Sequence, residues 1–160
     1  MARVAKVGLS YFPVDVDIFE DDKIQFVSAK FGVKGEGVLF RLLAKIYRNG
    51  YYIEFDEDVQ LLFSKHCGLE RNDNVTINVV EELLRRGFFD KDIFERFSVL
   101  TSKGIQKRYV KICKDSKRIL DNILPKYDLI REDCPIIRED SPIKRRKSTQ
   151  SKEKKSKEEK

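Results

Sequence analysis

The chain has 160 residues, of which 41% are hydrophobic and 38% charged, and it carries a formal net charge of +6 at pH 7. This length suits one domain with a hydrophobic core, and no stretch approaches the roughly 18–20 apolar residues that a membrane span needs. The N-terminal residues contain no long apolar run, so we expect no signal peptide, no membrane association and a cytoplasmic protein.

The N-terminal part predicts two consecutive helices. After the turn-like segment 9–13, apolar residues at helical spacing predict a first helix over about residues 15–31, which Gly32 ends. A second helix over residues 34–49 has its apolar side chains on one face, and Gly50 follows in the position of a left-handed C-cap.

One strand and two further helices follow. The aromatic and β-branched run 51–55 predicts a short strand. Asp56 is expected to cap a helix that Gly68 closes, and a further helix covers about residues 74–86.

The last predicted elements are a hairpin and a basic helix. Residues 88–90 and 93–100 are expected to form two strands joined by a turn at 90–92. A helix then runs from Lys103 to about Leu124 and stops before Pro125.

The order of these elements indicates the fold class. Residues 34–100 have the order helix, strand, helix, helix, strand, turn, strand, which is the connectivity of a winged helix. We therefore expect an α+β, mainly α, fold: a winged-helix domain (helix-turn-helix plus β-hairpin) with flanking helices over residues 8–118. A basic, largely disordered tail is expected over residues 119–160, because that segment has too few apolar residues to offset the entropy of ordering.

The charge is distributed unevenly. Residues 1–100 contain 14 Lys and Arg against 17 Asp and Glu, whereas residues 101–160 contain 19 against 10. A concentrated basic segment indicates a polyanionic partner, because Lys and Arg release counterions from DNA or RNA. A tail that only keeps the protein soluble explains the same composition.

The basic helix provides the first set of candidate DNA contacts. Positions 103, 107, 111, 114 and 118 recur at helical spacing, which places one cationic stripe along the helix. A solvated face opposite the apolar residues is the alternative explanation. The candidate DNA-binding residues of this helix are Lys103, Lys107, Arg108, Lys111, Lys114 and Arg118.

Three other segments provide further candidates. The expected recognition helix, 74–86, offers side chains that can contact base edges, but Glu81 and Glu82 on the same solvent side would oppose phosphates. The expected wing and the tail offer only phosphate contacts. The candidate residues are Asn74, Asn78 and Arg85 in the helix, Lys91 and Arg96 in the wing, and Lys144, Arg145, Arg146 and Lys147 in the tail.

No set of residues has the spacing of a catalytic, metal or cofactor site. Helix capping explains the acidic runs at 15–17 and 20–22, and His66 beside Cys67 points about 100° away from it on a helix. The three cysteines, Cys67, Cys113 and Cys134, form no Cys-x-x-Cys pair, so we expect reduced thiols. We therefore expect no enzyme, no cofactor and no metal.

Several motifs of the chain resemble a known family. They are Tyr11–Asp17 (YFPVDVD), Asp21–Ile24 (DDKI), Phe31–Glu36 (FGVKGE), Lys45–Tyr52 (KIYRNGYY), Leu84–Asp90 (LRRGFFD) and Leu100–Tyr109 (LTSKGIQKRY). Together they resemble the N-terminal domain of phage-type and mobile-element replication proteins, which is similar to the N-terminal winged helix of DnaD-type primosome and replisome-organiser proteins. The resemblance covers about residues 8–118.

This resemblance implies DNA binding in replication initiation, with a helicase or its loader as partner proteins. Family members with a clear role carry a further C-terminal domain, where this chain has only a basic tail. We therefore expect a DNA-binding accessory protein, of single- or double-stranded DNA, that acts mostly through non-specific phosphate contacts. The alternative is a protein–protein interaction or scaffold module, such as a dimerising winged helix, without a direct role at DNA.

Overall fold

The computed structural model describes residues 8–70, 73–116 and 123–130. The chain divides into a first unit that ends at Tyr127 and a second that begins at Asp128. In the second unit, the carboxylate of Asp128 accepts a hydrogen bond from the backbone N–H of Ile130 at 3.0 Å. All elements below belong to the first unit.

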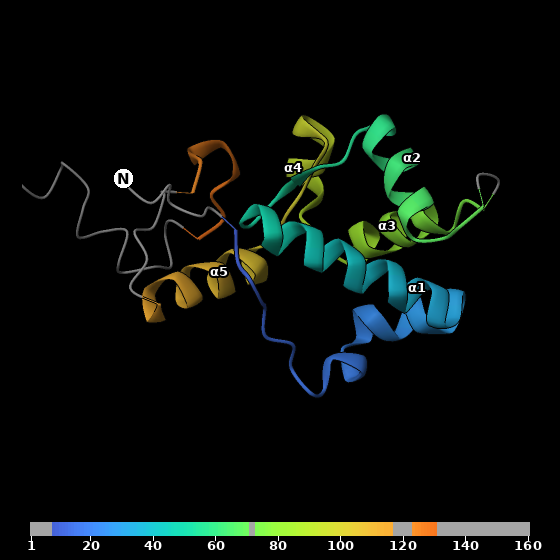
Figure 1. Cartoon of the computed structure of the whole chain (residues 1–160), viewed down its shortest axis with the longest axis horizontal. Coiled ribbons are helices and arrows are strands. Elements are labelled where there is room, and N and C mark those ends of the chain that lie inside the picture. Colours follow the sequence, from blue (N-terminus) through green and yellow to red (C-terminus); the bar gives the residue numbers. More distant parts are fainter. Residues whose placement is uncertain (1–7, 71–72, 117–122, 131–160) are drawn as a thin grey trace, which may run out of the picture. The chain divides into compact units, whose positions relative to one another are not determined.

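The first unit is mainly helical, with one small sheet (Figure 1). Its elements are the 3₁₀ helix η1 (Ile18–Glu20), α1 (Asp22–Asn49), β1 (Ile53–Glu54), α2 (Glu57–His66), α3 (Val75–Arg85), α4 (Lys91–Phe97), β2 (Val99–Leu100), α5 (Lys103–Asp115) and the 3₁₀ helix η2 (Pro125–Tyr127). This composition confirms the expectation of an α+β, mainly α, fold.

The sequence predicts two helices separated at Gly32, and this division is confirmed, because α1 consists of two helical segments that meet at a kink at this residue. Helix α1 has 28 residues and bends at Gly32, whose backbone has φ 60° and ψ −151°. Its N-terminal cap is Asp21, whose carboxylate accepts a hydrogen bond from the N–H of Lys23. The predicted start near Asp15 is therefore wrong, since residues 11–17 form a non-helical arm that leads into η1.

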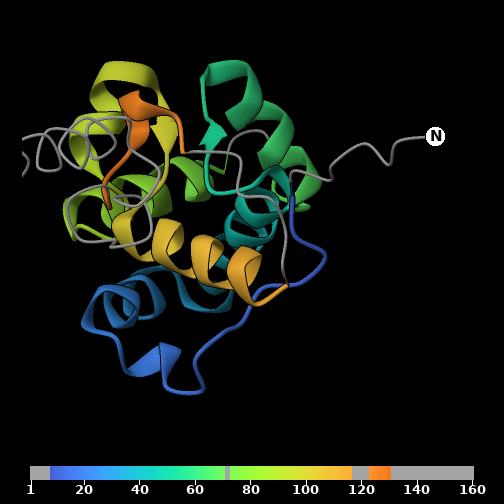
Figure 2. The same ribbon diagram turned by 90° about the vertical axis from the view of Figure 1, so that its left-hand side faces the viewer.

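The core forms where α1 packs against α3 (Figures 1 and 2). Leu39, Leu42 and Ile46 of α1 are fully buried, as are Val79 and Leu83 of α3. Each apolar side chain of this kind contributes about 1.5–3 kcal/mol when it leaves water.

The sheet joins two segments that are distant in sequence. Strand β1 pairs antiparallel with β2, with Ile53 opposite Leu100 and Glu54 opposite Val99. The hydroxyl of Thr101 donates a hydrogen bond to the carbonyl of Tyr51 at 2.7 Å, and this buried contact holds the start of α5 next to the sheet.

The β-hairpin predicted over residues 88–100 is wrong. Residues Lys91–Phe97 form the helix α4, so the part of the chain that the structure describes contains no hairpin wing. The carboxylate of Asp90 accepts a hydrogen bond from the N–H of Ile93 at 2.9 Å, which begins a helix where a turn was expected. The left-handed residue Ser98, with φ 52°, then ends α4 and leads into β2.

The basic helix begins at Lys103 as predicted. It ends at Asp115, and Ser116 follows as its C-cap. Ile123 and Leu124 are not helical, which corrects the predicted end near Leu124. Side-chain Nε2 of the buried Gln106 donates a hydrogen bond to the carbonyl of Tyr127 at 2.6 Å, so α5 is connected to η2.

Candidate nucleic-acid interface

Helix α5 presents a lysine-rich face to solvent. The hydroxyl of Ser102 caps the helix by accepting from the N–H of Ile105 at 3.2 Å. One face of the helix is buried by Ile105, Gln106, Tyr109, Val110 and Cys113. Lys103, Lys107, Lys111 and Lys114 are all exposed, so the structure confirms the predicted stripe in its described part. Arg118 lies outside the described residues.

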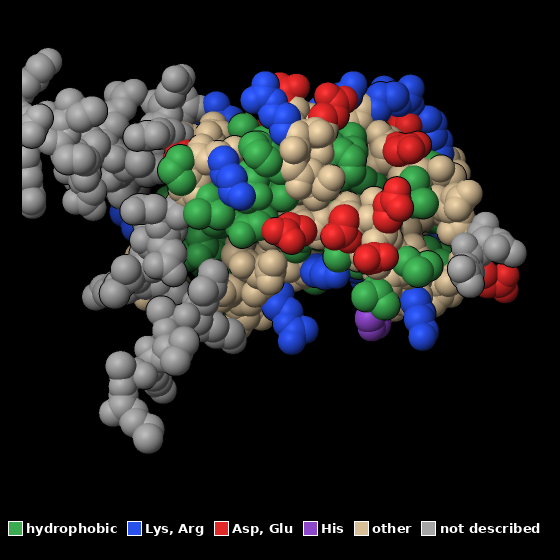
Figure 3. Space-filling model, turned by 90° about the horizontal axis from the view of Figure 1, so that it is seen from above, with side chains coloured by type: hydrophobic (Ala, Val, Ile, Leu, Met, Phe, Trp, Pro, Cys, Tyr) green, Lys and Arg blue, Asp and Glu red, His purple; other side chains and the backbone are tan. Residues whose placement is uncertain are grey.

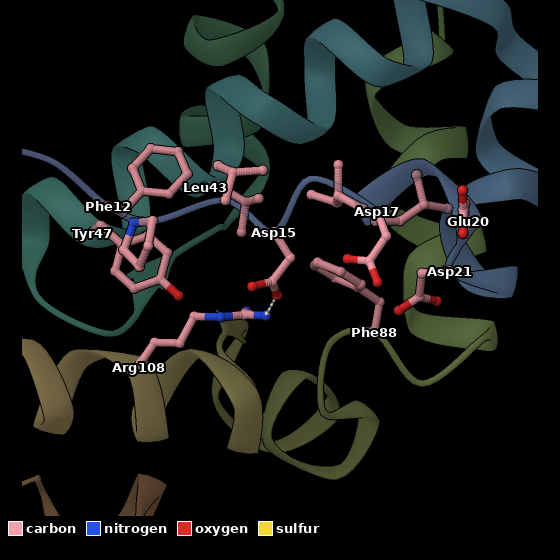
Figure 4. A pocket seen from close by; sticks show the side chains of 13 residues that line it. Phe12, Asp15, Asp17, Glu20, Asp21, Leu43, Tyr47, Phe88 and Arg108 are labelled. Atoms are coloured by element: carbon pink, nitrogen blue, oxygen red, sulfur yellow. Dashed lines mark hydrogen bonds and ion pairs between the residues drawn. The ribbon is translucent and has the colours of Figure 1, made fainter.

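Arg108 faces the N-terminal arm. Its guanidinium donates a hydrogen bond to the Asp15 carboxylate at 2.9 Å, across 93 positions of sequence (Figure 4). The guanidinium also lies beside the hydroxyl of the buried Tyr47. Burial raises the pKa of Tyr47, while the nearby Arg108 cation acts in the opposite direction. Arg108 therefore holds the arm against α5.

This contact borders a cavity of about 450 Å³ between the arm, α1 and α5. Its lining includes apolar side chains such as Leu43 and Phe88, and Asp17, Glu20 and Asp21 line it as well (Figure 4). These carboxylates would repel a phosphate, so we exclude the cavity from the nucleic-acid interface.

Helix α3 presents a second exposed stripe. Asn74, Asn78, Glu81 and Arg85 are exposed and recur at helical spacing, which agrees with the predicted solvent face of this helix. Asn74 occupies the N-cap position without a side-chain capping bond.

Glu82, by contrast, does not face solvent as predicted. Its side chain is 6% exposed and forms ion pairs with Lys30 at 2.8 Å, Arg85 at 2.6 Å and Arg86 at 3.0 Å. The hydrogen bond from Lys30 is the largest cause that lowers the pKa of Glu82 from 4.5 to about 2. Glu82 therefore joins α1 to α3, and only Glu81 of the predicted acidic pair is exposed.

The two residues assigned to a wing lie on α4. Lys91 begins this helix, with its ammonium 3.5 Å from the Glu95 carboxylate, and Arg96 is exposed in the last turn. They sit on the helix that replaces the hairpin, so they do not form a wing tip. The tail residues Lys144, Arg145, Arg146 and Lys147 lie outside the described residues.

Three lysines of α1 were missed in the sequence. Lys23 donates to the carbonyl of Gly87 at 3.4 Å, Lys30 reaches Glu82, and Lys34 lies 3.4 Å from the Asp73 carboxylate. The spacing of seven residues between Lys23 and Lys30 was an available signal, because it places these two on one side of a helix; Lys34 lies beyond the kink at Gly32 and could not be placed with them.

The cysteines and the possible metal ligands are the remaining candidate reactive groups. Burial raises the pKa of the Cys67 thiol, which makes it a weaker nucleophile at neutral pH. Cys67 and Cys113 are free thiols, and Cys134 is outside the described ranges. Over residues 8–70, 73–116 and 123–130, no group of three or more His, Cys, Asp or Glu side chains could hold a metal ion. The helices of the same ranges are all too short or too polar to cross a membrane.

Comparison with known proteins places the chain in a family. Residues 11–105 match the family described as Lin1244/Lin1753-like, N-terminal. The uncharacterized phage-related protein Lin1244/Lin1753 of Listeria innocua serovar 6a is 39% identical over 109 residues, which cover 68% of this chain and 35% of that protein. The chain thus matches about a third of the length of this relative. No solved structure matches the chain significantly. The chain belongs to the Lin1244/Lin1753-like family.

Proposed function

We propose that the protein binds DNA as an accessory factor of phage or mobile-element replication, mostly through non-specific phosphate contacts. The observation that carries this proposal is the exposed face of α5, where Lys103, Lys107, Lys111 and Lys114 follow one another at helical spacing. The phage-related relative supports the biological setting.

The energetics of this face favour a polyanion. Like charges three or four residues apart on a helix repel each other by a few tenths of a kcal/mol per pair. A phosphate backbone would remove this repulsion and release its own counterions, which provides most of the free energy of non-specific DNA binding. Asp115 is the exposed carboxylate at the C-terminal end of the stripe.

Sequence reading by α3 is the finer part of the proposal. α2 and α3 follow one another as in a helix-turn-helix unit, and Asn74 and Asn78 have amides that can pair with base edges. The exposed Glu81 would weaken such reading, so we assign most of the affinity to phosphate contacts. A helicase or its loader would be the partner in replication.

Fluorescence anisotropy with labelled single- and double-stranded DNA across a salt series tests the proposal. We expect log K to fall linearly with log salt, by about 0.9 per phosphate contact on duplex DNA. No binding at low salt, or an affinity that does not change with salt, would reject it.

A protein-binding scaffold is the second candidate function. Figure 3 shows hydrophobic side chains gathered beside a row of acidic ones on the face seen from above Figure 1. Leu61 and Leu62 of α2 are 52% and 56% exposed, and Phe97 of α4 is 41% exposed. Size-exclusion chromatography with light scattering distinguishes the two functions, because a stable homodimer that ignores DNA favours the scaffold.

A further inference from the structure

The lysines of α1 line the edge of α3. Lys23 contacts Gly87, which follows the C-terminal end of α3, and Lys30 contacts Glu82 in the last turns of α3. Lys34 contacts Asp73, which precedes the N-terminal end of α3. Because these contacts run in opposite chain directions, residues 23–34 of α1 lie antiparallel to α3. We name the set Lys23, Lys30, Lys34, Arg85 and Arg86 the α1–α3 seam.

One buried carboxylate fixes the centre of the seam. Glu82 accepts hydrogen bonds from Lys30, Arg85 and Arg86, at distances between 2.6 and 3.0 Å. The guanidinium of Arg86 also stacks on the ring of Phe26, 3.5 Å from its centroid. These contacts order long side chains that would otherwise lose up to about 2 kcal/mol each on binding a ligand.

The ordered cations still have donors that face solvent. Arg85 uses only Nη2 for Glu82, and its side chain is 59% exposed. A guanidinium has five N–H donors, so those on its other nitrogens can reach a phosphate. The Lys30 side chain is 44% exposed and that of Lys34 is 67% exposed.

Positive charge is concentrated at the centre of the seam, where Lys30, Arg85 and Arg86 surround Glu82. Four of the five seam cations contact a carboxylate, whereas Lys23 donates to a backbone carbonyl. The pKa of Glu82 is low enough to keep it ionised at neutral pH. Further exposed acids flank both ends and the side of this edge: Asp21 and Asp22 at the start of α1, Glu70 beside Lys34, and Glu81 on α3. At the centre of the seam, three cations surround one carboxylate, and the positive charge that remains beside a candidate recognition helix can attract a DNA phosphate.

We propose that the α1–α3 seam is a second phosphate-binding surface for the DNA backbone, separate from α5, and that Glu82 is the residue that positions its cations. This inference rests on the proposed function. Phosphate contacts fix how a protein is oriented on the duplex. The seam would therefore determine how α3 is positioned on the DNA.

Anisotropy with duplex DNA on the full-length chain tests the seam. The variant Lys30→Gln/Arg85→Gln removes two seam cations, and the control Arg48→Gln/Lys65→Gln removes one arginine and one lysine at exposed positions elsewhere. We expect the seam variant to flatten the salt slope by roughly two and to weaken binding severalfold beyond the control.

Equal effects of the two double variants, in a protein that binds DNA, would overturn the seam and leave the proposed function intact. A wild-type chain that does not bind DNA would reject both. If Lys30→Gln/Arg85→Gln does not fold, Lys23→Gln/Lys34→Gln replaces it, because both lysines make only 3.4 Å contacts at exposed sites. The same loss beyond the control is expected, and its absence again overturns the seam.

Discussion

The ammonium of Lys30 on α1 lies 2.8 Å from the carboxylate of Glu82 on α3, which is 6% exposed. This contact connects the two helices that form the core, and Arg85 and Arg86 complete it from the same turn of α3. A largely buried carboxylate of this kind is stabilising only while its partners are present. The cluster around Glu82 therefore links the stability of the fold to the seam proposed above.

Replacing Glu82 by Gln lowers the free energy of unfolding by roughly 1–3 kcal/mol, because three cations lose their common anion. Urea denaturation measures this loss. Glu81→Gln is the matched control, since Glu81 is the exposed neighbour on the same helix, and its effect stays within about 0.5 kcal/mol. An equal loss of unfolding free energy in the two variants would contradict the buried, ion-paired position of Glu82.

The stabilisation by Glu82 depends on pH. Its pKa is lowered from 4.5 to about 2 in the folded chain, so the unfolded chain takes up a proton first as the pH falls. The contribution is complete above pH 4.5 and disappears progressively as the pH approaches 2. The difference in unfolding free energy between wild type and Glu82→Gln should therefore shrink over this range, and a difference that stays constant would contradict the ion pairs.

Two glycines of α1 respond oppositely to alanine. At Gly35 a Cβ would lie 2.6 Å from Cβ of Phe31 and 3.0 Å from Cγ1 of Val27, so Gly35→Ala must move packed side chains and destabilises. At Gly37 a Cβ meets nothing within 4 Å, so Gly37→Ala stabilises by about 0.5–1 kcal/mol through helix propensity. Thermal melts of the two variants check the opposite signs, and a stabilising Gly35→Ala would contradict the close approach at this bend.

The cap of α4 distinguishes the helix from the predicted hairpin. Asp90→Ala removes the hydrogen bond to the N–H of Ile93 and lowers the free energy of unfolding by about 1 kcal/mol. Asp90→Asn retains an acceptor and loses less. Asp92→Ala, at an exposed position of the first turn, is the control for charge. If the Asp90 and Asp92 variants lose equally, α4 is not capped as observed.

The hairpin shows where the sequence was ambiguous. The run 93–100 is rich in apolar and aromatic residues, which fits a strand, yet Ile93 and Phe97 are also one helical turn apart. Asp90 favours a tight turn and an N-cap equally, since both use its short carboxylate. In the structure, β2 pairs with β1, more than forty residues earlier in the chain, and not with residues 88–90. Residues 91–97 therefore have no strand partner and form a helix.

The sequence predicted those features of the candidate site that depend on the spacing of residues within a single helix. The α5 lysines follow from spacing alone, and their exposure is confirmed. The contact of Arg108 with Asp15 was not visible, because it joins residues 93 positions apart. Glu82 was misplaced because it lies at the edge of the buried face of α3, although two arginines three and four residues later were a signal for a paired carboxylate.

Removing the Asp15 carboxylate should release Arg108 for phosphate contacts. We expect Asp15→Asn to strengthen DNA binding severalfold at low salt, and by more than Asp17→Asn, which removes the same charge from the arm without a bond to Arg108. Anisotropy on both variants measures the difference, and adding Arg108→Gln should abolish it. Equal gains in the two Asp variants would show that Arg108 does not compete for DNA.

The salt dependence of DNA binding by the variant Lys111→Gln/Lys114→Gln tests the central claim most directly. Both lysines are exposed on α5, and Lys45→Gln/Lys65→Gln removes the same charge from exposed positions on α1 and α2. We predict that the α5 variant flattens the slope of log K against log salt by roughly two, while the control stays close to wild type. Identical slopes for the two variants would contradict the assignment of DNA binding to α5.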